Sequence, residues 1–289
     1  MLGVPHIVVC VNKMDLVDYD EKVFEAIRDE FGGFATRLRV RDLTFIPVSA
    51  LKGDNVVTRS KAMPWFDGSP LLSHLERLHV ASDRNLVDVR FPVQYVIRPQ
   101  RTDVLDYRGY AGTVASGVLK KGDQVVVLPS GLESTIAAIH TADGEVDEAF
   151  PPMAVTITLA DELDISRGDM LCRPHNMPTV AQDIDAMVCW MDETAALAKG
   201  RKYQIKHTTR WARAMVRDLD YRIDVNTLHR DDTATELSLN EIGRVQLRVT
   251  QPMFIDPYQE NRQTGSFILV DEGSNRTVAA GMISRLHGG

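Results

Sequence analysis

Hydrophobic and polar positions divide the chain into two regions with different periodicity. The first region opens with a continuous apolar run, Ile7 to Val11, which is typical of a strand buried on both faces of a parallel sheet. Apolar residues then recur at helical spacing from Asp18 to Phe31, and Gly32 and Gly33 follow as a stop signal. The pattern therefore predicts a strand and then a helix over 18–31.

A second strand and helix follow in the same order. The run from Leu43 to Val48 predicts another buried strand. The segment 69–79 predicts a helix with Pro70 in its first turn and with leucines on one face, namely Leu71, Leu72, Leu75 and Leu78. The N-terminal region thus has a βαβα pattern, which indicates an α/β domain.

From about Asp88 the pattern changes to short β-rich runs separated by Gly, Pro, Asn and Asp, which predicts barrels or sandwiches. The first group of runs is 91–97, 110–118, 124–128, 135–140 and 155–159. After a break at 173–178, the second group is 185–191, 203–205, 210–218, 243–249, 265–270 and 277–283. We therefore expect α/β structure followed by all-β structure, with domains at 1–86, 87–178 and 179–289.

Composition and charge narrow the class of protein. The chain has 289 residues, of which 44% are hydrophobic and 25% charged, as in soluble globular proteins. Its net charge of −7 argues against nucleic acid or an anionic membrane as the main partner. No apolar run reaches the ~20 residues that span a bilayer, and the N-terminus lacks signal-peptide features. We expect a cytoplasmic protein with reduced cysteines.

The sharpest motif is Asn12-Lys13-Met14-Asp15, directly after the first apolar strand. N-K-x-D at the carboxyl end of a parallel strand is the guanine-reading motif of GTP-binding domains. In this interpretation Asp15 accepts hydrogen bonds from the guanine ring N–H and amino group. The Lys13 stem covers the base, and the Asn12 amide ties neighbouring loops together.

The alternative is an accidental polar turn, because three fixed residue types occur by chance in roughly 4% of chains of this length. Context favours the guanine site. Ser49-Ala50-Leu51 follows the second strand and matches the other base-contacting loop of GTPases, where backbone N–H groups meet the guanine carbonyl oxygen.

The phosphate-binding half of a GTP site is absent from the sequence. No segment fits GxxxxGK[ST], whose backbone N–H groups cradle phosphates and whose Ser or Thr binds magnesium. We therefore expect the N-terminal part of a GTPase domain to be missing, and no tightly bound cofactor in this chain. Cys172 and His175 have no second pair of ligands, so we propose no metal site. We also identify no catalytic residue.

When further segments of the sequence are considered together with these motifs, the chain resembles the large GTPase subunits of bacterial heterodimeric ATP sulfurylase. These subunits belong to the translation-factor family related to elongation factor Tu. Met-Pro-Trp and Tyr-Arg-Gly-Tyr segments point to the sulfurylase subunits in particular. The matching stretches are 12–19, 49–56, 63–66, 91–96, 107–112 and 164–169.

The resemblance implies a P-loop GTPase domain, of which 1–86 is the C-terminal remnant, followed by two β-barrels. It implies that GTP hydrolysis, with Mg in the complete domain, drives synthesis of adenosine 5′-phosphosulfate from ATP and sulfate. A small partner subunit holds the adenylyl-transfer site, and in some relatives an adenylylsulfate kinase domain follows. The implied guanine contacts are Asn12, Lys13, Asp15, Ser49, Ala50 and Leu51.

A function of a different class stays open: an elongation-factor-like protein whose barrels bind aminoacylated RNA. The net charge disfavours it only weakly, because a local basic patch suffices for RNA. The sulfurylase-like segments disfavour it more.

Two weaker features have competing interpretations. Lys199 to Arg217 contains seven basic residues and no acid, and its strand-like alternation favours a solvated barrel face over a contact for an acidic partner or nucleic acid. Trp65 and Phe66 are expected to pin their loop onto the sheet, the alternative being a docking loop for a partner.

Overall fold

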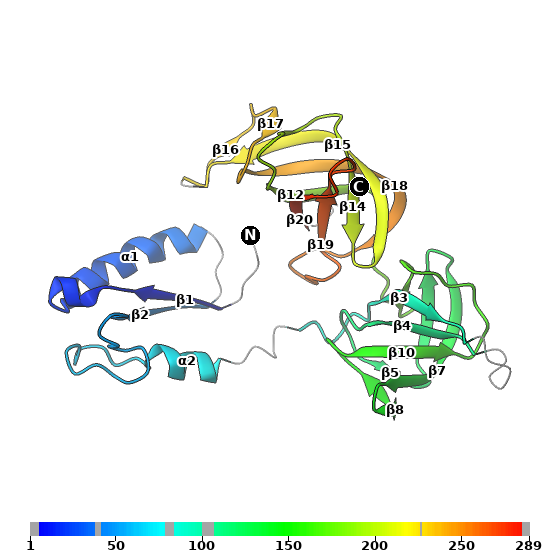
Figure 1. Ribbon diagram of the computed structural model, residues 1–289, viewed down its shortest axis with the longest axis horizontal. Helices are drawn as coiled ribbons and strands as arrows, with labels where there is room; N and C mark the ends of the chain where they lie inside the picture. Colours follow the sequence, from blue (N-terminus) through cyan, green and yellow to red (C-terminus); the bar gives the residue numbers. More distant parts are fainter. Residues whose placement is uncertain (1–5, 38–41, 79–83, 100–106, 226, 285–289) are drawn as a thin grey trace. The chain divides into compact units, whose positions relative to one another are not determined.

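The computed structural model describes residues 6–37, 42–78, 84–99, 107–225 and 227–284. The chain divides into two compact units, Met1–Asp83 and Arg84–Gly289. The first unit carries the α/β elements, and the second consists of two closed sheets (Figure 1). The predicted fold, an α/β start followed by two β-barrels, is confirmed.

The N-terminal unit is built on one parallel strand pair. Strand β1 (His6–Val11) pairs with β2 (Asp42–Pro47), so that Val9 lies opposite Phe45. The crossover between them contains the 3-10 helix η1 (Met14–Val17) and helix α1 (Glu21–Arg37), and α2 (Leu71–Arg77) follows β2. The carboxyl ends of β1 and β2 therefore lie side by side, as parallel pairing through a crossover requires.

Both predicted ends of the first helix are wrong. Helix α1 begins at Glu21 instead of Asp18, because Asp18 and Tyr19 have left-handed φ angles of 51° and 57°. It also continues past Gly32 and Gly33 to residue 37. Its final turns pack against the unit: Ala35 is 3% exposed, and the Phe31 ring contacts Phe45 with 5.9 Å between centroids. This packing outweighs the cost of about 1 kcal/mol for each glycine.

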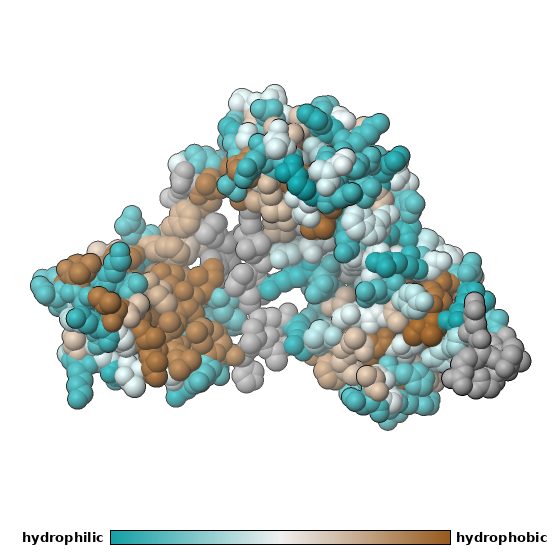
Figure 2. Space-filling model, viewed as in Figure 1, coloured by the Kyte–Doolittle hydropathy of each residue, from teal (hydrophilic) through white to brown (hydrophobic). Residues whose placement is uncertain are grey.

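The second helix is shorter than the predicted 69–79, of which residue 79 lies outside the described part. Helix α2 starts after Pro70, which occupies the N-cap position instead of the first turn. Leu72 and Leu75 are 44% and 49% exposed, although the pattern predicted one buried face. The described strands of this unit form only a two-stranded sheet, which offers little area for the helix to cover. Figure 2 shows apolar side chains gathered on this unit between α1 and α2.

The first barrel is closed by pairing of β10 with β7, in the strand order β10-β4-β3-β11-β6-β7-β8. Phe91 and Tyr110 are among its buried core residues. Its strands are β3 (Phe91–Ile97), β4 (Gly109–Thr113), β6 (Gln124–Leu128), β7 (Leu132–Thr141), β8 (Gly144–Val146), β10 (Ala154–Leu159) and β11 (Met170–Cys172), with a small pair β5 (Leu119–Lys120) and β9 (Glu148–Ala149).

The predicted strand 110–118 is wrong in its second half. Strand β4 ends at Thr113, and the chain then turns so that Ser116 forms a β-bridge with Arg90. Gly117 has a φ of 75°, and a Cβ there would lie 2.5 Å from the Cα of Val89. A continuous strand is excluded because this close approach needs a glycine in a left-handed conformation.

The second barrel has the strand order β14-β19-β20-β12-β18-β15-β16 and is closed by pairing of β14 with β15. Several of its strands are longer than predicted because they curve around the barrel and pair with two neighbours. Its strands are β12 (Thr179–Trp190), β14 (Lys202–His207), β15 (Arg210–Ile223), β16 (Arg230–Asp231), β18 (Ile242–Ile255), β19 (Ser266–Val270) and β20 (Thr277–Ile283), with a small pair β13 (Leu197–Ala198) and β17 (Glu236–Leu237).

Buried charges connect the two barrels. Arg90 is 3% exposed, and its Nε and Nη2 each donate to a different carboxylate oxygen of Asp256 at 2.9 Å. Arg210 pairs with Asp169 at 3.6 Å and lies 4.9 Å from the centroid of the Phe254 ring. Arg210 is therefore not on a solvated face, which corrects the sequence-based interpretation for this member of the basic run.

Candidate functional site

The loop after β1 presents the N-K-x-D residues at the carboxyl end of the parallel pair. Lys13 has a left-handed φ of 66°, which turns the chain sharply away from the strand. Met14, which is 1% exposed, anchors the turn, and its backbone N–H donates to Val48 O at 3.2 Å. Asn12 and Lys13 are left exposed and Asp15 half-buried. The buried Met14 thus holds the loop against the rest of the unit, while Asn12 and Lys13 remain exposed.

Asn12 joins this loop to the one that follows β2. Its side-chain Oδ1 accepts a hydrogen bond from Lys13 N–H at 2.7 Å and another from Ala50 N–H at 3.0 Å. The amide therefore ties the two loops together, as the motif predicted.

Asp15 and Ser49 form the second link between the loops. The buried Ser49 hydroxyl donates to Asp15 Oδ1 at 2.7 Å and accepts from Lys52 N–H at 3.2 Å. Because the single hydroxyl hydrogen is directed at Asp15, the carboxylate is held in one orientation. Among the described residues, no hydrogen bond reaches Asp15 Oδ2.

Among the described residues, one backbone N–H group of the second loop has no hydrogen-bond acceptor. Ala50 N–H is taken by Asn12, and Lys52 N–H is taken by Ser49. Within the described part of the chain, Leu51 N–H makes no hydrogen bond, and the Leu51 side chain is 85% exposed. The structure thus brings Asn12, Asp15, Ser49 and Ala50 together, and leaves Lys13 and Leu51 exposed beside them.

The residues that support this second loop were not predicted from the sequence. Asp54 accepts from the Tyr19 hydroxyl at 2.9 Å and from Ser60 Oγ at 2.7 Å. The hydrogen bond to the Asp54 carboxylate raises the pKa of Tyr19, because ionisation would lose that bond. Buried Asn55, with a left-handed φ of 55°, donates to Pro47 O at 3.0 Å and accepts from Ser60 N–H at 2.8 Å. The only sequence signal was that Tyr19, Asp54 and Asn55 lie in stretches that carry the resemblance.

The aromatic pair after this loop packs against the unit, as predicted, but its ring contacts are with a helix. Trp65 Nε1 donates to Tyr19 O at 3.0 Å, and the Trp65 and Phe66 rings pack on Phe24 at centroid distances of 5.4 and 6.2 Å. These contacts pin the segment onto helix α1, so the rings pack inward as predicted, although the prediction named the sheet as the surface that they cover.

Two family models match the β-rich part of the chain. Elongation factor Tu domain 2 matches residues 110–172, and the GTP-eEF1A C-terminal domain-like model matches residues 183–284. A solved structure of sup35 complexed with GMPPNP is similar over 98% of this chain and 69% of its own, with a TM-score of 0.64 and 22% identity. At that identity the likeness shows the fold alone.

Curated relatives are more similar in sequence. The bifunctional enzyme CysN/CysC of Mycobacterium tuberculosis (strain ATCC 25618 / H37Rv) is 60% identical over 285 residues, covering 99% of this chain and 46% of that protein. Sulfate adenylyltransferase subunit 1 of Bacteroides fragilis (strain YCH46) is 48% identical over 283 residues, covering 98% and 58%. The chain thus spans about half the length of the curated relatives it matches.

None of the described helices is long and apolar enough to cross a membrane. Across the described part of the chain, no three His, Cys, Asp or Glu side chains are grouped so that they could hold a metal ion.

Proposed function

Because this chain is a homologue of sulfate adenylyltransferase subunit 1, we propose that it forms the base-recognising and β-barrel part of a GTP-binding subunit. In this proposal GTP hydrolysis is coupled to the synthesis of adenosine 5′-phosphosulfate from ATP and sulfate. The observation that carries the proposal is the pair of side-chain links between the loops after β1 and β2, Asn12 to Ala50 and Ser49 to Asp15.

The geometry of these loops fits guanine. A carboxylate offers about four lone-pair sites, and Ser49 uses one of them on Asp15. The remaining sites suit the ring N–H and amino group of guanine, whereas adenine lacks this pair of donors. The Leu51 N–H is free to donate to the guanine carbonyl oxygen, and the exposed Lys13 stem can cover the base. We assign these four contacts together with the loop-tying roles of Asn12 and Ala50.

Phosphate and magnesium binding are assigned to no residue here, because the sequence contains no GxxxxGK[ST] segment. In the complete subunit, bound Mg-GTP would supply a phosphoryl group whose transfer to water drives the coupled reaction. The residues of this chain hold and identify the base.

We also propose the division into 1–86, 87–178 and 179–289 and a small adenylyl-transferring partner subunit. The relative named subunit 1 implies an enzyme of more than one subunit. The matches to elongation factor Tu domain 2 and to the GTP-eEF1A C-terminal model support barrels of translation-factor type. The sulfate adenylyltransferase relatives, at 48–60% identity over almost the whole chain, favour the sulfate function over an elongation-factor-like one.

The test uses the heteromeric enzyme that carries this sequence together with a P-loop. Synthesis of adenosine 5′-phosphosulfate should depend on GTP, and Asp15→Asn should shift the preferred nucleotide toward xanthosine triphosphate. The expected shift is about 100-fold, since two charge-assisted hydrogen bonds contribute about 1.5 kcal/mol or more each. Asp18→Asn, an exposed carboxylate in the same loop, is the matched control. An unchanged preference in Asp15→Asn would remove Asp15 from the site, and synthesis independent of GTP would contradict the coupling.

A further inference from the structure

One outer face of the second barrel gathers basic and apolar side chains. In the β14–β15 pairing, Lys202 lies opposite Met215 and Lys206 opposite Trp211. In the next pairing, Met215 lies opposite Arg248 of β18. Directly paired residues share a face of a sheet, and alternate residues of β15 return to it. We call this surface the basic face; its members are Lys202, Lys206, Trp211, Arg213, Met215, Arg217 and Arg248.

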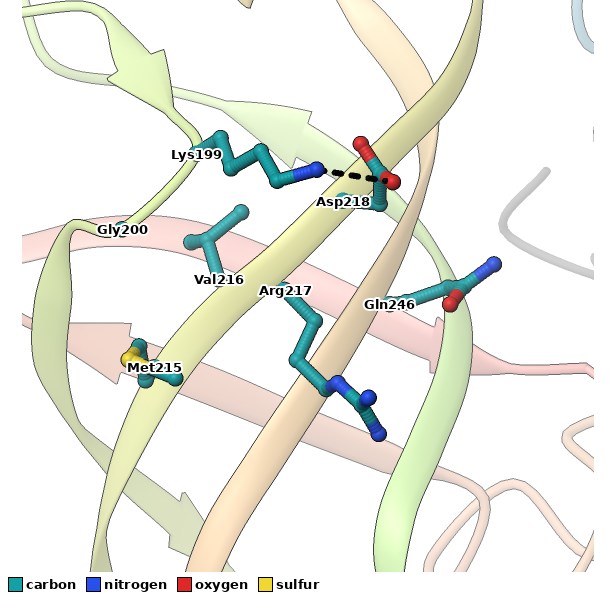
Figure 3. Close-up of a pocket in the computed structure, with 7 residues that line it drawn as sticks. All are labelled: Lys199, Gly200, Met215, Val216, Arg217, Asp218 and Gln246. Atoms are coloured by element: carbon teal, nitrogen blue, oxygen red, sulfur yellow. Dashed lines mark hydrogen bonds and ion pairs between the residues drawn. The ribbon is translucent and has the colours of Figure 1, made fainter.

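The apolar members of the basic face are exposed in its middle. Trp211 is 42% and Met215 39% exposed. The Lys206 ammonium lies 5.7 Å from the centroid of the Trp211 ring, so the two side chains form a cation–π contact. A groove of about 360 Å³ runs beside Met215 and Arg217 (Figure 3). It is lined also by Gln246 and by Lys199, which pairs with Asp218 at 3.1 Å. Exposed aromatic and methionine side chains ringed by arginines are typical of protein interfaces.

Carboxylates neutralise the basic face only in part. Asp183 pairs with both Arg217, at 3.2 Å, and Arg248, at 2.6 Å, so one carboxylate serves two guanidiniums. Arg213 pairs with Glu272 at 3.0 Å. Among the described residues, Lys202 and Lys206 form no ion pair. The surface is therefore positive in a chain whose net charge is −7.

We propose that the basic face docks an acidic surface of the partner subunit, with Trp211 and Met215 as its apolar anchors. The inference rests on the proposed function for the existence of that subunit and adds where it binds. Surplus positive charge favours an acidic partner by complementarity and steers the encounter. The exposed apolar pair supplies the area that becomes buried.

A protein partner fits this face better than RNA does. The carboxylates of Asp183 and Glu272 stand among the arginines, where they would repel a phosphate backbone. A protein surface with mixed polar groups can pair with both signs of charge. A second copy of this chain is a third occupant, which the test separates.

The test measures binding of the purified small adenylyl-transferring subunit to this chain by calorimetry at several salt concentrations. Arg213→Glu with Arg217→Glu should weaken binding about tenfold or more and reduce its salt dependence. Lys120→Glu with Lys121→Glu is the matched control: these lysines are 59% and 50% exposed and pair with Glu148 and Glu145. The control has the same change of charge on the first barrel and should bind as the wild type does.

Trp211→Ala tests the apolar part of the same face. It should also weaken binding about tenfold but leave the salt dependence as in the wild type. Circular dichroism of each variant checks that the barrel is folded.

Each remaining outcome has a distinct meaning. Absence of binding by the wild type would overturn this inference, whereas the proposed function is decided by the GTP dependence of synthesis. Equal binding by the wild type, the double variant and Trp211→Ala would overturn the inference alone. If the variants lose transfer RNA binding but keep partner binding, the basic face belongs to RNA. If they lose self-association but keep partner binding, the basic face belongs to a second copy of this chain. Either result would overturn the inference.

Discussion

Ser49 donates its only hydroxyl hydrogen to Asp15 Oδ1 at 2.7 Å, across two loops that are 34 residues apart in sequence. Ser49 is fully buried and Asp15 half-buried, so the serine acts from inside the unit on a carboxylate that faces outward. The bond fixes which oxygen of Asp15 is turned inward and which is available to a ligand.

Removing this hydroxyl should loosen the carboxylate and also leave Lys52 N–H without its acceptor. In a subunit that carries this sequence with a P-loop, Ser49→Ala should weaken binding of guanosine diphosphate about tenfold, since a hydrogen bond to a charged group contributes about 1.5 kcal/mol. Fluorescence titration measures it. Thr58→Ala removes an exposed hydroxyl nearby and serves as the control. Equal affinities for Ser49→Ala and the wild type would show that Asp15 is oriented by other contacts.

The buried pair between the barrels should dominate the stability of the second unit. Arg90→Ala leaves the Asp256 carboxylate, whose side chain is 12% exposed, without its partner, and should lower the free energy of unfolding by about 3–5 kcal/mol. Urea unfolding of the chain measures the change. Arg98→Ala, which removes a pair at 3.9 Å with side chains 50% and 95% exposed, should change it by about 1 kcal/mol or less. Similar losses in the two variants would refute the structural role of the Arg90 pair.

His207 should make the second barrel sensitive to acid. It is 1% exposed, its Nε2–H donates to Thr264 O at 2.7 Å, and Asp256 and Arg210 are the charged groups that act on it. Burial lowers the pKa of His207, so below about pH 6.5 the unfolded chain binds a proton that the folded chain does not. The stability that neutral His207 contributes is therefore fully present above that pH. Below it, the free energy of unfolding falls as the pH falls, by at most about 1.4 kcal/mol per pH unit.

Urea unfolding between pH 5 and 8 tests the His207 prediction. His207→Gln keeps a neutral donor and should flatten the dependence in this range. His175→Gln, at an exposed position, should leave the slope as in the wild type. An unchanged slope in His207→Gln would show that another group titrates.

The N-terminal unit should open more readily than the second barrel. Strand β1 pairs only with β2 among the described strands, whereas β12 is paired on both sides, with β18 and β20. Hydrogen exchange in the complete chain should therefore be at least about tenfold faster in β1 and β2 than in β12 and β18. Equally slow exchange in both sets, in a monomeric sample, would contradict this expectation.

The sequence by itself determined the order of the elements and the position of the two loops. Apolar runs and their spacing are local signals, and the N-K-x-D and S-A-L motifs each follow such a run directly. The link between Asn12 and Ala50 was therefore predictable, because parallel strands bring consecutive loops to one edge of the sheet. The guanine contacts themselves stay a prediction.

Only the tertiary structure decided features that depend on distant pairing. Helix α1 passes two glycines because Phe31 and Ala35 gain partners from elsewhere in the chain, which a local stop signal cannot reveal. Arg90 finds Asp256 166 residues away. The sequence of 199–217 predicts one basic strand pair. In the structure Arg210 lies in the junction between the two barrels, whereas Arg213 and Arg217 lie on the outer surface of the second barrel. The reason is that register and closure are set by the whole barrel, since side chains alternate between its two faces.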